Sequence, residues 1–183
     1  MIYKFSLQLM GVVAGIFLVL LGLVGLLRPK SVRDFAQSFP RSRLAGILLL
    51  TLAFAWSLWL LATMEMGEFS GFRKPLLIAL PIGYLLVMRF VEEFLSVRAL
   101  GILCLLAAEP LIDAAFFRYE SSRLLVTVLA YLLVIVGLIW VTMPYLLRDQ
   151  VNWSMRSDGR WRLLNGLALG YGALILIFAI AQY

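Results

Sequence analysis

The sequence predicts an all-α integral membrane protein with six transmembrane helices, arranged as three tandem helical hairpins in the same orientation. Its composition is 63% hydrophobic and only 14% charged, with a mean hydropathy of +0.99 over 183 residues. About a quarter of the residues in a soluble domain are charged, so this composition excludes a soluble globular protein. Six spans leave loops too short for a second domain, and we expect residues 1–183 to form a single transmembrane domain.

Long apolar runs predict the spans, because a helix of about 20 residues crosses a hydrocarbon core about 30 Å thick. The expected spans cover residues 6–27, 44–64, 72–91, 94–117, 124–143 and 163–183. They pair into hairpins over about 1–65, 72–117 and 122–183. The third span has the shortest uncharged run, and we expect Arg73, Lys74 and Arg89 to extend towards the membrane surface from its ends.

Two polar linkers interrupt the apolar runs. The first, Arg28 to Arg43, has apolar residues at helical spacing, which predicts an amphipathic helix over about 31–39 lying in the headgroup plane. The second runs from Pro144 to Arg162. A shift of 115 positions places Gly22–Ser42 over Gly137–Ser157, and both copies carry Pro, Arg and Asp at matching places, so we interpret them as an internal repeat.

Basic residues are concentrated in alternate loops. Five lie in the first linker, two in residues 89–98 and four in residues 148–162, against five in all the other loops and the N-terminal segment. Cytoplasmic loops carry the excess of Lys and Arg, so this distribution predicts cytoplasmic linkers and places both termini outside the cytoplasm.

The segment 20–60 resembles a known group of sequences. It contains Gly22-Leu23, Pro29, Arg33, Pro40 and Arg43-Leu44-Ala45-Gly46. With these residues it is similar to the short two-helix bacterial inner-membrane proteins grouped as a family of unknown function. The resemblance covers about a fifth of the chain, and the second copy has Met155 in place of Pro40. It implies a bacterial cytoplasmic (inner) membrane and no particular activity.

Glu109 and Asp113 are candidates for a site within the membrane. They lie four residues apart on one helix face, and ionisable residues inside spans often have functional roles. Two neighbouring carboxylates can share a proton or hold a hard cation. The alternative is that the fourth span ends near Ala108, with Asp113 in an external loop and paired to Arg118 or Arg123. The sequence leaves both interpretations open.

The linkers carry a repeated charged pair, Arg33-Asp34 and Arg148-Asp149. These residues are candidates for docking a cytoplasmic partner or binding anionic lipid headgroups, and simple solvation at the membrane surface is the alternative. The tryptophans near the second linker, Trp140, Trp153 and Trp161, are typical of an aromatic belt or of a contact with a partner subunit.

Two Gly-x-x-x-Gly pairs predict close helix packing, because glycine lets two helix backbones approach. Gly11 and Gly15 lie in the first span, and Gly166 and Gly170 lie in the last. We expect the two pairs to pack against each other.

The sequence argues against several functions. It has no histidine and a single cysteine, Cys104, so no common metal site, disulfide or histidine base is available within it. No nucleophile with a base and no nucleotide-binding loop can be named, and we expect neither an enzyme nor a protein with a cofactor or metal. The net charge of +6 is explained by the span ends, so we expect no nucleic acid partner.

Two functions remain open. We favour an accessory, scaffold or assembly subunit of a bacterial membrane complex, with the lipid bilayer and other membrane protein subunits as its partners. The alternative is a small transporter or channel for a proton, a cation or a small solute, using Glu109 and Asp113.

Overall fold

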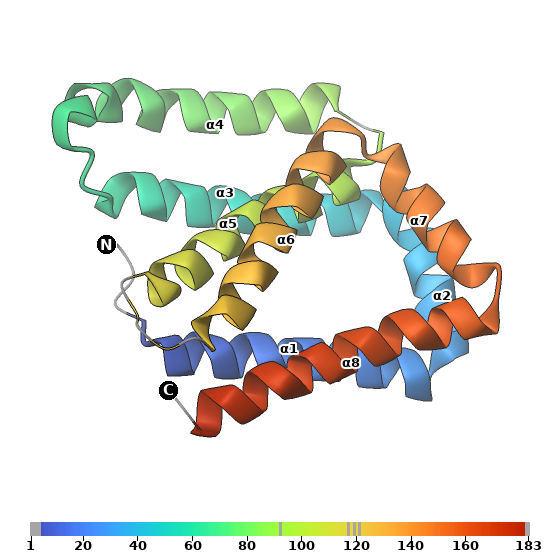
Figure 1. Ribbon diagram of the computed structural model, residues 1–183. Helices are drawn as coiled ribbons and strands as arrows, with labels where there is room; N and C mark the ends of the chain where they lie inside the picture. The colour runs from blue at the N-terminus through green and yellow to red at the C-terminus, as the bar shows by residue number, and fades with distance from the viewer. Residues whose placement is uncertain (1–4, 92, 117, 119, 121, 182–183) are drawn as a thin grey trace.

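The structure is a computed structural model and describes residues 5–91, 93–116, 118, 120 and 122–181. Within these residues the regular structure is helical and contains no strand (Figure 1). The helices are α1 (Leu7–Leu27), α2 (Pro29–Ser38), η1 (Phe39–Arg41), α3 (Arg43–Thr63), η2 (Gly67–Phe72), α4 (Arg73–Phe90), α5 (Leu95–Ala115), α6 (Arg123–Thr142), α7 (Tyr145–Met155) and α8 (Asp158–Ala181).

Six helical segments of the described chain are long and apolar enough to cross a membrane. They are α1, α3, α4 together with η2, α5, α6 and α8. The expected all-helical fold with six candidate spans is therefore confirmed. Pro81 and Pro110 lie inside α4 and α5 without ending either helix.

The linkers differ in detail from the expectation. The helix α2 begins at Pro29 instead of residue 31, because proline is well suited to the first helical position, where no backbone N–H is needed. The second linker contains a helix of its own, α7, which was not expected. Its last residues belong to α8, which begins at Asp158 and not near residue 163.

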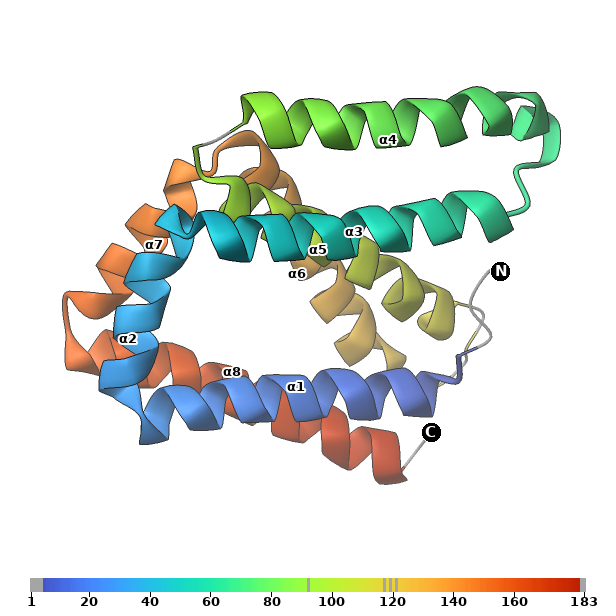
Figure 2. The same cartoon turned by 180° about the vertical axis from the view of Figure 1, so that it is seen from behind.

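The two linker helices lie at one end of the bundle. Both views show α2 and α7 together there, while the first residues of α1 and the last residues of α8 lie at the opposite end (Figures 1 and 2). We call these the linker end and the terminal end. Successive long helices run in alternate directions between them, as the chain of a multi-pass protein must.

The helices that pack most extensively are not those joined by the long linkers. The largest contacts are between α1 and α8, between α5 and α6, and between α3 and α5, followed by α3 and α4. Thus α1 and α8 pack together although they lie at opposite ends of the sequence, whereas α1 and α3, joined through α2, lie apart (Figure 2).

Several glycines lie where two helices approach closely. A Cβ built on Gly101 of α5 lies 2.8 Å from the carbonyl oxygen of Gly137 on α6, and a Cβ on Gly137 lies 2.8 Å from the carbonyl oxygen of Gly101. A Cβ built on Gly172 of α8 likewise lies 2.8 Å from Leu18 Cβ on α1. In these places any larger side chain would push the two backbones apart.

Candidate functional site

The helix α5 carries Glu109 and Asp113 to the terminal end of the bundle. It continues without interruption to Ala115, and Pro110 is buried within it. The helix therefore does not end near Ala108, and Glu109 and Asp113 lie in a helix and not in a loop. Because the two carboxylates are one helical turn apart, they project from the same face of α5.

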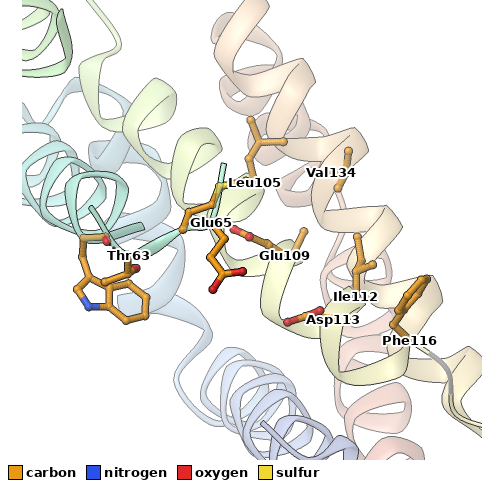
Figure 3. Close-up of a pocket in the computed structure, with 11 residues that line it drawn as sticks. Thr63, Glu65, Leu105, Glu109, Ile112, Asp113, Phe116 and Val134 are labelled. Carbon is orange, nitrogen blue, oxygen red and sulfur yellow. Dashed lines mark hydrogen bonds between the residues drawn. The ribbon is translucent and has the colours of Figure 1, made fainter. Parts of the chain in front are cut away.

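These two residues face an open cleft of about 880 Å³. The wall is made by the last turn of α3 and the residues after it, by α5 and by α6. Figure 3 shows Glu109 and Asp113 with Glu65 around the same opening. The other lining residues are Trp59, Thr63, Met64, Leu105, Ala108, Ile112, Phe116 and Val134.

The composition of this cleft suits a cation with an apolar body. Three carboxylates supply negative charge, and Trp59 and Phe116 add aromatic side chains to the lining, of the kind that binds organic cations. The described residues contain no group of three His, Cys, Asp or Glu side chains placed to hold a metal ion. The cleft thus offers a cation electrostatic attraction by carboxylates and stacking on aromatic side chains.

The repeated charged pairs do not form equivalent contacts. Arg148 Nη2 lies 3.1 Å from Oδ1 of its neighbour Asp149, whereas Arg33 Nη2 lies 2.7 Å from Oδ1 of Asp158 on α8. The Asp158 side chain is 76% exposed, so this pair is accessible to solvent. The structure therefore separates the two arginines into two different environments.

A buried tryptophan holds α8 against α1. Trp161 is only 7% exposed, and its indole Nε1–H donates to the carbonyl of Gly25 at 2.9 Å. That carbonyl has no helical donor, because the residue four positions on is Pro29, which lacks an N–H. The indole thus satisfies an acceptor that the α1–α2 corner leaves open.

Arg33 and Asn165 complete this cluster. The Arg33 guanidinium lies 5.1 Å from the centroid of the Trp161 ring, and Asn165 Nδ2 donates to the Trp161 carbonyl at 2.8 Å. The expectation that Trp161 belongs to an aromatic belt is wrong, because its side chain is buried inside the protein. The sequence signal that could have predicted this buried cluster is Asn165, because a polar residue within a span usually faces other helices.

The two glycine pairs also have different surroundings. Gly11 and Gly15 are buried, and a Cβ on Gly15 would lie 3.0 Å from the Gly172 carbonyl oxygen. Gly166 and Gly170 are exposed, with no atom within 4 Å of an added Cβ. The expected packing of Gly166 and Gly170 on α1 is therefore wrong, because they lie on another face of α8.

Comparison of the chain with protein-family models, with curated proteins and with solved structures gives no match in any of the three. The features that bear on function are therefore those of the chain itself: the carboxylate-lined cleft, the charged linkers and the exposed glycine pair.

Proposed function

We propose that this chain is a non-enzymatic multi-pass membrane protein that acts as an accessory, scaffold or assembly subunit of a bacterial membrane complex. The observation that carries this proposal is the exposed pair Gly166 and Gly170. In α8 they lie four residues apart on a face that no described residue covers. Such a pair lets a second helix approach closely within a bilayer, where packing is a main driving force for association.

The charge distribution supports a definite topology. At the linker end lie the basic residues of both linkers, and we place this end in the cytoplasm of a bacterial inner membrane with both termini on the other side. The matching order of long helix, short helix and long helix in α1–α3 and α6–α8 supports tandem hairpins of the same orientation. Alkaline phosphatase fused to the C-terminus should then be active, and an inactive fusion would overturn this topology.

The association is tested by purification in mild detergent. We expect the wild-type chain to retain a membrane protein partner, and the variant Gly166→Leu/Gly170→Leu to lose it without any decrease in its own unfolding midpoint. Gly83→Leu is the matched control, since Gly83 of α4 also has no atom within 4 Å of an added Cβ. A wild-type chain that purifies alone, or equal loss in the control, counts against the proposal.

The cleft favours a second candidate function, the binding or transport of a cation or small solute through Glu109 and Asp113. Both residues line a cleft of about 880 Å³, and two aromatic residues, Trp59 and Phe116, also line it. The matching probe is tetraethylammonium, a quaternary ammonium cation of the kind that aromatic side chains bind and one that crosses a protein-free bilayer only slowly. In proteoliposomes we expect uptake to fall about tenfold in Glu109→Gln/Asp113→Asn, consistent with the loss of charged partners.

Glu68→Gln provides the control for charge alone. Glu68 lies in η2 and does not line the cleft, so its loss should leave uptake unchanged. Equal uptake by wild-type, double-variant and protein-free liposomes would exclude this second function without affecting the first.

A further inference from the structure

A small basic pocket lies at the linker end, away from the carboxylate-lined cleft. It has a volume of about 200 Å³ and lies where α2, η1 and α7 meet the start of α5. Its polar lining consists of Arg41, Arg148, Gln37 and Asn152, and no carboxylate lines it. The walls therefore offer two guanidinium groups and two amide groups to whatever occupies the space.

The two arginines retain donors for a ligand. Arg148 donates to Asp149 through Nε and Nη2, at 3.2 and 3.1 Å, which leaves its Nη1 without a partner among the described residues. Arg41 is exposed and makes no hydrogen bond or ion pair within the described part of the chain. Arg33, the other arginine of the repeated pair, is by contrast held by Asp158 and does not line the pocket.

The backbone beside the pocket has an unusual conformation. Pro40 is buried, and Phe94 adopts φ 55° and ψ 29°, a left-handed conformation that is strained for a bulky side chain. The hydroxyl of Ser96 donates to the Phe39 carbonyl at 2.7 Å and ties η1 to α5 beside this strained residue. This hydrogen bond thus joins the backbone of η1, which carries Arg41, to the start of α5 beside Phe94.

We infer that this pocket binds a phosphate group, supplied by the headgroup of an anionic lipid. Arginine binds phosphate oxygens through paired N–H donors, and amide N–H groups complete such sites. A water molecule occupies about 30 Å³ of the liquid, so the pocket has room for a phosphate and a few waters. The linker helices connect the ends of membrane spans, where anionic headgroups are concentrated. This site does not depend on the helix association proposed above.

The test uses the full chain in nanodiscs of phosphatidylcholine with or without phosphatidylglycerol, and a parallel sample in detergent with inorganic phosphate. Bound lipid is counted by native mass spectrometry, and the unfolding midpoint reports stabilisation. We expect wild-type protein to retain phosphatidylglycerol and Arg41→Gln/Arg148→Gln to retain about tenfold less, because each loss removes charge-assisted hydrogen bonds.

Arg28→Gln/Lys30→Gln serves as the matched control, because it removes the same number of charges from exposed residues of the first linker that do not line the pocket. Unchanged retention in the control supports the site, while an equal fall in both variants overturns it in favour of general charge attraction. A third outcome is that inorganic phosphate stabilises the protein, Arg41→Gln removes this stabilisation, and phosphatidylglycerol is not retained. That outcome overturns the lipid as the source of the phosphate and assigns the pocket to soluble phosphate. No response to either ligand overturns the phosphate site altogether.

Discussion

The contact between α1 and α8 is predicted to depend on Gly22. A Cβ on this residue would lie 2.6 Å from the Asn165 carbonyl oxygen and 2.8 Å from the Leu169 backbone nitrogen. Both atoms belong to the backbone of α8 and cannot rotate away. To restore an ordinary contact of about 3.4 Å, α8 must move by roughly 0.6–0.8 Å, which would loosen the packing around it.

The expected magnitude for Gly22→Ala follows from two opposing terms. Overpacking of a rigid contact costs about 1–3 kcal/mol, and the rigid backbone atoms favour the upper part of that range. Replacing glycine by alanine within a helix offsets up to about 1 kcal/mol. We therefore expect a net loss of about 1–2 kcal/mol in the free energy of unfolding.

Gly166→Ala is the matched comparison, since it makes the same chemical change in a helix of the same pair. No atom lies within 4 Å of an added Cβ there, so only the gain in helix propensity remains, up to about 1 kcal/mol. The assay is unfolding of the detergent-solubilised protein by increasing sodium dodecyl sulfate, followed by tryptophan fluorescence. Equal midpoints for the two variants would refute this account of the α1–α8 contact.

Three further predictions concern single contacts. Trp161→Phe should lower the free energy of unfolding by about 1 kcal/mol or more, because the Gly25 carbonyl loses its donor, and the same detergent titration measures it. Gly25→Ala brings a Cβ to within 2.5 Å of the Asn165 amide carbon, and Asn165→Ala removes that amide. We therefore expect the double variant to lose less unfolding free energy than the two single variants lose in total. Losses that simply add would exclude the clash. Ser96→Ala should cost about 1 kcal/mol through loss of its bond to the Phe39 carbonyl and speed hydrogen exchange in η1, whereas unchanged exchange would show that this bond does not hold η1.

The candidate site was only partly predictable. The spacing of Glu109 and Asp113 placed them on one helix face, and the structure confirms that α5 carries both. Their cleft depends on where α3 ends and on the position of α6, which are contacts between distant parts of the chain. Likewise, Trp161 and Asn165 interact with α1 across more than a hundred residues, and no local pattern specifies that pairing.

The sequence alone determined the six long helices. A helix that crosses a bilayer needs about 20 apolar residues, and its backbone groups must bond to one another, so a plot of hydropathy along the sequence identifies such helices directly. It also determined the amphipathic first linker. Only the tertiary structure decided which helices pack together and which glycines make the contact, as Gly172 and not Gly166 or Gly170 faces α1. The physical reason is that a span is apolar on every side, so its periodicity does not distinguish the face that meets another helix from the face that meets lipid.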